Sequence, residues 1–196
     1  MKELYDKIYS NQNHNWFPSY GYSNHGSIWK NLILRLNPKS WLDVGCGHNK
    51  LIKDIRENNL VEDSWGIDFS CPGADQQCDI LDLPFTDKRW DFITAFDVME
   101  HLYSDQISSA LNEMMRVSKR FAFTIDFNKD FKVDGKKKHA SIGLPDGTPP
   151  GSGWPRETWV KEIESISNNI IWNIPKSSDQ SMWEQSERFF IGEWKQ

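Results

Sequence analysis

A short apolar strand that runs into two glycines and then into a helix is the feature that most constrains how this chain can fold. Residues 40–44 have the composition of a buried strand, the turn Gly45-Cys46-Gly47 follows, and residues 51–58 carry apolar side chains at helical spacing. Glycines in such a turn allow positive φ angles and close approach of a ligand to backbone N–H groups, and the helix N-terminus attracts negative charge. The segment therefore predicts a ligand-binding turn in an α/β domain.

Strands and helices continue to alternate after this turn. Helices are expected at residues 106–117 and from residue 155 onward, and further strands at residues 64–68, 77–80, 90–96, 120–125, 169–174 and 187–194. Alternation of this kind is typical of a doubly wound sheet with helices on both faces, and two closing strands without a helix between them favour an antiparallel edge. We therefore expect a Rossmann-like, doubly wound α/β sheet of seven strands, mostly parallel with an antiparallel final strand.

The composition limits the class of protein. The 196 residues suit one domain, 38% of them are hydrophobic, and the net charge of −5 does not favour a surface built as a whole for nucleic acid or anionic lipid. No apolar run is long enough to span a membrane, and the first residues lack the apolar core of a secretory signal. The three cysteines lack disulfide or metal-ligand spacing, so we expect no metal and a cytoplasmic location.

Acidic residues accompany the predicted strands at the edge where ligands bind in such sheets. Asp43 lies in the first strand, Asp68 ends the second and Asp79 lies in the third. A dinucleotide fingerprint requires a third glycine where this chain has Lys50, which disfavours a nicotinamide cofactor. A carboxylate at the end of the second strand can accept both hydroxyls of a ribose, and a merely solvated aspartate gives the same sequence signal.

Five motifs occur in a fixed order: DVGCG, GID, DILDLPF, FDVMEHL and LNEMMRVSKRF. Together they resemble the class I S-adenosylmethionine-dependent methyltransferases, specifically the small type 11 group, over residues 39–125. The resemblance implies S-adenosylmethionine as cofactor, S-adenosylhomocysteine as product, and a single methyltransferase domain over residues 1–196. In it, residues 1–37 would form N-terminal lid helices, residues 38–125 the cofactor-binding half, and residues 126–196 the substrate loop and C-terminal strands.

On the nucleoside side, the resemblance implies four cofactor-binding residues. Asp68 would hold the ribose and Phe69 would pack beside the adenine. Asp79 would accept the exocyclic amine of the adenine, while the backbone N–H of Ile80 would face a ring nitrogen.

On the methionine side, the resemblance implies a second group. Gly45, Cys46 and Gly47 would line the methionine with backbone groups, and Asp43 would sit near its amino group. Phe96 and Asp97 would pass beneath the sulfonium. The family commonly has a small residue and then a glycine after this turn, whereas this chain has His48-Asn49-Lys50. Asn49 tolerates the left-handed conformation that a glycine takes, and we expect it to be a cofactor-binding residue.

Two histidines are the candidate catalytic residues. A general base is needed when the acceptor loses a proton, and imidazole titrates in the useful range. His101 follows the fourth strand, where the family's Glu-His pair borders the methyl site; its alternative role is to orient the next helix. His139 follows the fifth strand, and its alternative is a surface position.

The acceptor site is expected to use both ends of the chain. The substrate-binding residues implied by likeness to related enzymes are Tyr20, Tyr22, Trp154 and Arg156. The lysine-rich loop 129–139 is either solvated or attracts an anionic acceptor.

The acceptor class follows from motifs that are missing from the fourth strand. Its end carries neither an N/D-P-P-Y/F motif nor a Pro-Cys pair, which argues against methylation of nucleobase amines and of cytosine carbon. We expect a small molecule or saccharide methylated on oxygen or nitrogen, with nucleic acid and membrane disfavoured as partners. A nucleic-acid or protein methyltransferase, and a non-catalytic S-adenosylmethionine-binding protein, remain as alternatives.

Overall fold

The computed structural model describes part of the chain. The described residues are Tyr5, Asp6, Tyr9, Ser10, Leu34, residues 36–125, the backbone of 132–133 and 136–137, residues 156–168 and residues 189–195. Within them the helices are α3 (Lys50–Glu57), the 3-10 turn η1 (Met99–His101), α4 (Ser104–Val117) and α5 (Arg156–Ile166). The strands are β1 (Ser40–Val44), β2 (Asp63–Asp68), β3 (Gln76–Gln77), β4 (Trp90–Phe96), β5 (Ser118–Thr124), β6 (Lys132–Val133), β7 (Lys136–Lys137), β8 (Ser167–Asn168) and β9 (Phe189–Trp194).

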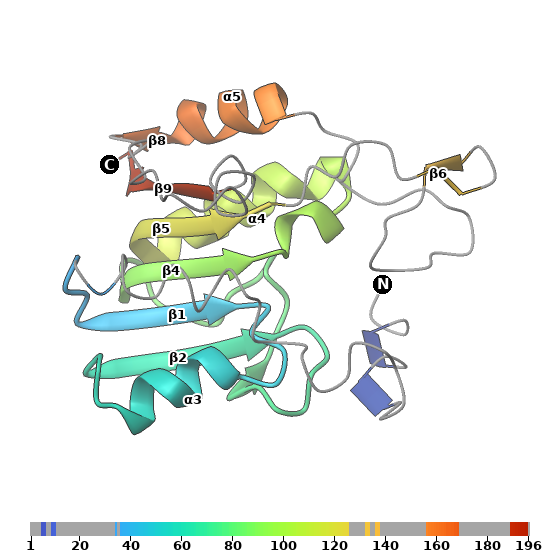
Figure 1. Cartoon of the computed structure of the whole chain (residues 1–196). Helices are drawn as coiled ribbons and strands as arrows, with labels where there is room; N and C mark the ends of the chain where they lie inside the picture. The colour runs from blue at the N-terminus through green and yellow to red at the C-terminus, as the bar shows by residue number, and fades with distance from the viewer. Residues whose placement is uncertain are drawn as a thin grey trace, which may run out of the picture.

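The main sheet of the described residues has the strand order β3-β2-β1-β4-β5-β9-β8 (Figure 1). Neighbours from β3 to β5 pair in parallel, and β9 pairs antiparallel with both β5 and β8. The predicted Rossmann-like sheet, mostly parallel with an antiparallel final strand, is confirmed. The strand predicted at 77–80 is shorter and ends at Gln77, and the strand predicted at 169–174 lies outside the described residues.

Each face of the sheet carries its own apolar core, because successive strand residues point to opposite faces. On one face Phe92 and Phe189 pack with Leu51, Ile52 and the rest of the inward side of α3. On the other face the strand residues pack against α4 and α5; the cluster includes Ile93, Phe121, Phe123, Phe190, Leu111, Met114, Trp159 and Ile163. Helices therefore cover both faces, as the alternation of strands and helices predicts.

The order of the strands determines where a ligand can bind. The chain moves outward from β1 to β2 and β3, then returns to place β4 on the other side of β1. The loops after β1 and β4 therefore leave the sheet in opposite directions, and the resulting crevice at the carboxyl ends is where open α/β sheets bind ligands. No helix among the described residues is long and apolar enough to cross a membrane.

Candidate functional site

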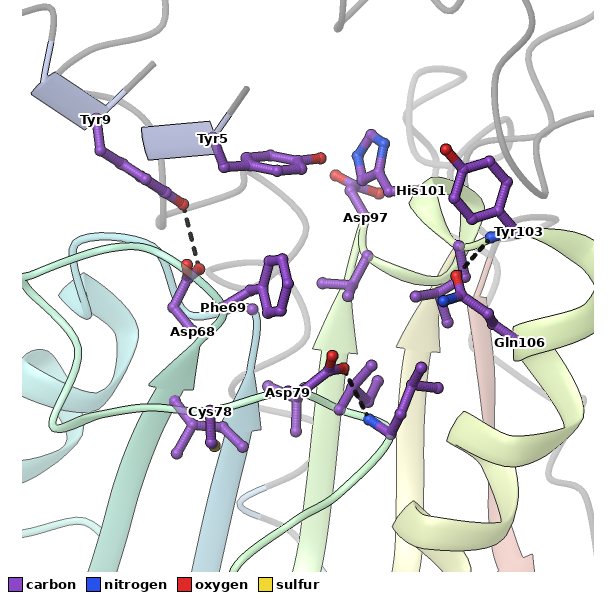
Figure 2. Close-up of a pocket in the computed structure, with 17 residues that line it drawn as sticks. Tyr5, Tyr9, Asp68, Phe69, Cys78, Asp79, Asp97, His101, Tyr103 and Gln106 are labelled. Atoms are coloured by element: carbon purple, nitrogen blue, oxygen red, sulfur yellow. Dashed lines mark hydrogen bonds between the residues drawn. The ribbon is translucent and has the colours of Figure 1, made fainter. Parts of the chain in front are cut away.

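A cavity of about 340 Å³ lies at the carboxyl ends of the parallel strands. Its walls come from the turn after β1, the loops after β2 and β3, the segment after β4, the start of α4, and two N-terminal tyrosines. Figure 2 shows these residues above the strand ends. Seven of the predicted site residues line it, namely Gly45, Asp68, Phe69, Asp79, Ile80, Asp97 and His101.

The turn after β1 requires glycine at position 45. Gly45 has φ +71°, and a Cβ built there would lie 2.3 Å from Cγ2 of Val98 in the segment after β4. The backbone N–H of Cys46 donates to the carbonyl of Ile67 at 3.0 Å, which ties the turn to β2. Backbone atoms of Gly45 therefore face the cavity without a side chain in the way.

The side chain of Asp68, in the cavity wall, accepts four hydrogen bonds from described residues. Its Oδ1 accepts backbone N–H groups from Ser70 at 2.9 Å and from Cys71 at 2.8 Å. Its Oδ2 accepts the N–H of Gly47 at 3.0 Å and the hydroxyl of Tyr9 at 3.1 Å (Figure 2). Asp68 as a whole residue is only 8% exposed, so these four donors replace the water that a carboxylate needs.

Asp79 is held by the turn that follows β3. Its Oδ1 accepts the backbone N–H of Leu81 at 3.0 Å, and the backbone N–H of Asp82 donates to the carbonyl of Asp79 at 3.1 Å. This turn sets the Asp79 side chain beside Ile80 in the cavity wall, with the ring of Phe69 from the loop after β2 in the same wall (Figure 2). The wall thus combines one carboxylate with apolar and aromatic surface.

The segment after β4 carries the second group of polar residues. Asp97 has φ +55°, and its backbone N–H donates to Oγ1 of Thr124 while the Thr124 hydroxyl donates to its Oδ1 at 2.8 Å. His101 ends η1, and the edge of its ring contacts Tyr5, with the ring centroids 6.1 Å apart. Tyr103 is half exposed at the same rim (Figure 2). An imidazole and two phenols therefore surround the cavity mouth.

Asp43 is buried below the cavity wall. Its Oδ1 accepts the hydroxyl of Thr94 from the neighbouring strand at 2.6 Å, and Thr94 in turn accepts the indole N–H of Trp41. Burial raises the pKa of Asp43 to about 7, and the nearby charge of Asp68 acts in the same direction. Asp43 is thus a carboxyl group that is only partly ionised near neutral pH.

Other residues predicted for the cofactor side lie behind the cavity. Gly47 supports Asp68 through its N–H, and Cys46 is buried, with a pKa raised by that burial. Asn49 takes the left-handed conformation, with φ +62°, and its side chain fills the space over Gly66. Phe96 packs against the core on the α3 face. Asn49 and Phe96 are therefore placed as packing residues, because the strand alternation and the tight turn direct them away from the cavity.

The predicted acceptor residues lie largely beyond the described part of the chain. His139, Tyr20, Tyr22 and Trp154 are outside the described residues. Arg156 begins α5, is half-buried and does not line the cavity. Within loop 129–139, the described backbone of β6 pairs antiparallel with that of β7.

Ten lining residues were not predicted as site residues from the sequence. They are Tyr5, Tyr9, Val44, Ile67, Cys78, Leu81, Val98, Leu102, Tyr103 and Gln106. Five of them lie inside the quoted motifs and two more lie directly beside one, so taking every residue of each motif and its immediate neighbours would have included these seven: Val44, Ile67, Cys78, Leu81, Val98, Leu102 and Tyr103. The i, i+4 spacing of Tyr5 and Tyr9 is the sequence signal that could have placed both on one face of an N-terminal helix. Within the described residues no group of three or more His, Cys, Asp or Glu could hold a metal ion.

Fold and site together define an α/β protein with a cavity at the switch point of its sheet. The sequence matches the model of one such family over residues 25–162. That model is of a methyltransferase domain, type 23 of that series, and covers more than half of the chain. The chain belongs to this methyltransferase domain family, and the resemblance to class I methyltransferases is confirmed. No curated protein sequence matches the chain.

Several solved structures share the fold at low sequence identity. The PH0226 protein from Pyrococcus horikoshii OT3 has a TM-score of 0.63 and 13% identity, covering 94% of this chain and 98% of that one. The putative methyltransferase solved in complex with the Trm112 methyltransferase activator of Haloferax volcanii has a TM-score of 0.61 and 13% identity, covering 100% of this chain and 97% of that one. The 1,6-didemethyltoxoflavin-N1-methyltransferase of Burkholderia thailandensis, solved with 1,6-didemethyltoxoflavin and S-adenosylhomocysteine bound, has a TM-score of 0.61 and 13% identity, covering 98% and 85%.

Proposed function

We propose that this protein is an S-adenosylmethionine-dependent methyltransferase that moves a methyl group to oxygen or nitrogen of a small molecule or saccharide. The observation that carries the proposal is the cavity wall itself. It sets Asp68 at the end of β2 and Asp79 after β3, beside the exposed backbone of Gly45. Membership of a methyltransferase family supports the reaction class.

The residues present fit a nucleoside-bearing cofactor. Asp68 accepts a hydroxyl from Tyr9, so the position that this hydroxyl occupies is suited to a ribose hydroxyl in its place. Asp79 has one oxygen committed to the N–H of Leu81, which leaves the other for the amine of an adenine. Phe69 and Ile80 supply the flat and apolar surface that a base requires. When bound, S-adenosylmethionine would supply an electrophilic methyl group on its sulfonium.

This chain's own residues then orient the acceptor and exclude water. The tyrosines at the rim reduce the access of solvent, and Asp97 is fixed in one orientation by two hydrogen bonds with Thr124. We assign His101 the role of general base, since its imidazole is a candidate to take the proton that an O–H or N–H acceptor loses. Holding the reacting groups in line accounts for most of the catalysis expected in such a site.

The charges around the cavity favour a neutral or cationic acceptor. Asp68, Asp79 and Asp97 line it, and no lysine or arginine does so among the residues that the structure describes. An anionic acceptor such as nucleic acid would be repelled at this wall. A small-molecule acceptor also agrees with the Burkholderia thailandensis neighbour, whose structure contains 1,6-didemethyltoxoflavin. The nucleic-acid or protein methyltransferase is therefore the second choice.

A transfer assay tests the proposal. Methyl-labelled S-adenosylmethionine is incubated with the protein and with sugars, amines, phenols and heterocycles, and labelled product is measured. Transfer to one of these classes, lost in His101→Gln and kept in the exposed-site control Asp82→Ala, supports the proposal. If the protein binds the cofactor but transfers no methyl group to these compounds, to RNA or to protein, the result would instead favour a non-catalytic S-adenosylmethionine-binding protein.

A further inference from the structure

The carboxylate of Asp68, which is proposed to hold a ribose, already accepts hydrogen bonds at every available position. All four of its donors come from the protein, and three of them are backbone N–H groups, from Gly47, Ser70 and Cys71. The fourth is the side-chain hydroxyl of Tyr9, which reaches Oδ2 at 3.1 Å. A carboxylate offers about four acceptor positions, so each of them is already used.

Only one of these four donors can leave without damage to the fold. The N–H groups of Gly47, Ser70 and Cys71 belong to the turns that connect β1 to α3 and follow β2, and both turns form the cavity wall. The Tyr9 hydroxyl is attached to a side chain of the N-terminal segment, which is joined to Asp68 across 59 positions of sequence. A ribose hydroxyl that binds Asp68 must therefore take the place of the Tyr9 hydroxyl.

Tyr9 is held firmly enough for this exchange to matter. The residue is only 7% exposed. Its ring meets the ring of His48 edge-on, with the centroids 5.6 Å apart, and lies 6.4 Å from that of Tyr5. A hydrogen bond between a hydroxyl and a carboxylate that are both shielded from water is stronger than one on the surface.

We propose that Tyr9 is a built-in competitor of the ribose: its hydroxyl occupies the position on Asp68 that a ribose hydroxyl takes over, so cofactor binding and release of Tyr9 are coupled. This inference rests on the proposed function, because it assumes that Asp68 receives a ribose. Tyr9 then lowers the affinity for any ribose-bearing ligand by the factor needed to break its own bond. It also covers Asp68 when no ligand is bound.

Tyr9 either competes with the ribose or only supports the cavity wall. These two roles predict opposite changes in the affinity for S-adenosylhomocysteine when Tyr9 is replaced by phenylalanine. Tyr9→Phe keeps the ring and its contacts with His48 and Tyr5 but removes the hydroxyl. If Tyr9 competes with the ribose, the variant binds S-adenosylhomocysteine about tenfold more tightly, while the ligand-free protein melts a few degrees lower. If Tyr9 only supports the wall, both the affinity and the melting temperature fall.

The experiment measures both quantities on the full chain. Calorimetry gives the dissociation constants of S-adenosylhomocysteine and of two smaller probes, adenosine and 2′,3′-dideoxyadenosine, and thermal unfolding gives the stability. The matched control is Ser108→Ala, which removes a hydroxyl that donates to a carboxylate of Glu162 on the exposed surface between α4 and α5. The control should leave all three affinities unchanged.

Tighter binding of S-adenosylhomocysteine and adenosine by Tyr9→Phe, without a similar gain for the dideoxy probe, is the expected result. Unchanged or weaker binding of S-adenosylhomocysteine by the variant, while the unmodified protein binds it, overturns the competition and leaves the proposed function standing. An equal gain for the dideoxy probe also overturns it, because the ribose hydroxyls would then play no part. Failure of both proteins to bind S-adenosylhomocysteine rejects the proposed function, and the competition with it.

Discussion

The two sides of the cavity are built by different means. On the side where we propose that the nucleoside binds (the nucleoside side), Asp68 and Asp79 are fixed chiefly by backbone N–H groups, most of them from positions two or three residues further along the chain, with Tyr9 as the one side-chain donor. On the side where we propose that the acceptor binds (the acceptor side), Tyr5 and His101 are almost a hundred residues apart in sequence and meet through ring contacts. Local turns define the first side, whereas the packing of distant segments defines the second.

This difference indicates what each side is for. A site made of backbone donors in tight turns has little freedom, which suits a ligand portion that is the same for every member of the family. A site made of side chains from separate segments can change residue by residue without disturbing the fold, which suits an acceptor that varies. We therefore expect substitutions on the nucleoside side to change cofactor affinity, and those on the acceptor side to change turnover.

The largest effect that separates the two sides is expected at His101. Because a general base contributes about 10²- to 10⁴-fold, His101→Gln should lower kcat by about that factor and change the dissociation constant of S-adenosylhomocysteine by less than threefold. Steady-state kinetics with the acceptor found in the transfer assay, together with calorimetry, gives both numbers. Equal losses in turnover and in cofactor affinity would remove the distinction between the two sides.

Asp43, which lies beneath the nucleoside side, should make stability depend on pH. Its pKa is raised to about 7 in the folded protein, so the folded state binds the proton more tightly than the unfolded state does. The contribution of Asp43 to the free energy of unfolding is therefore present at pH 4 and is lost as the pH rises through 7. For a shift of this size the loss is up to about 4 kcal/mol. Melting temperatures between pH 4.5 and 8 should fall in the unmodified protein more steeply than in Asp43→Asn.

A different group of carboxylates limits stability at lower pH. Hydrogen bonds lower the pKa of Asp75, Asp91 and Glu113, chiefly those from Arg56, Lys119 and Arg116 respectively. Their contribution is present above the ordinary pKa of a carboxyl group and is lost as the pH falls below it, which is outside the window of Asp43. If the melting temperatures of the unmodified protein and of Asp43→Asn change in parallel between pH 4.5 and 8, the pKa of Asp43 is not raised and this prediction is wrong.

Asp79 tests whether the nucleoside side extends beyond the ribose. Asp79→Ala should weaken the binding of S-adenosylhomocysteine about 10- to 100-fold, since it removes a hydrogen-bonded carboxylate from a partly buried wall. Asp82→Ala, an exposed aspartate three positions further along the chain, is the control and should change the affinity less than twofold. Similar losses in both variants would mean that net charge, rather than contact with the adenine, determines the binding.

The smallest effect is expected at the turn between the two sides. Gly45→Ala places a Cβ at positive φ and against Val98, so the free energy of unfolding should fall by about 1–2 kcal/mol. Val98→Ala in the same chain removes the clash but not the φ strain, and should restore part of the loss. Denaturant unfolding of the two single variants and the double variant measures the coupling, and strict additivity would place the two segments further apart than the structure does.

The sequence predicts one side of this cavity far better than the other. The position of Asp68, Asp79 and Gly45 follows from strand ends and turn residues, which are local patterns, and the structure brings all three to one cavity. Tyr5 and Tyr9 could not be placed there, because nothing local relates them to β2 or η1. Phe96 shows that a motif alone does not predict the direction of every side chain. Successive strand residues point to opposite faces of the sheet, and Phe96 packs against the core on the α3 face.

The fold shows the same division. The alternation of strands and helices predicts the parallel sheet and its antiparallel final strand, while the third strand ends earlier than predicted. The residues of this strand show no alternation of polar and apolar side chains. The chain turns after Gln77 because the backbone N–H of Leu81 donates a hydrogen bond to the side chain of Asp79. Turn chemistry thus overrides strand propensity at the position where the adenine is proposed to bind.

We propose that Asp68 holds the ribose of S-adenosylmethionine, and the other assignments on the nucleoside side depend on it. Calorimetric titration with S-adenosylmethionine and with S-adenosylhomocysteine, for the unmodified protein, Asp68→Ala and the control Asp82→Ala, tests it most directly. We predict micromolar binding of both ligands that is lost in Asp68→Ala and kept in the control, with thermal unfolding showing that the variant is still folded. Undetectable binding to the unmodified protein, or equal binding by a folded Asp68→Ala, would show that Asp68 does not hold the ribose of this cofactor.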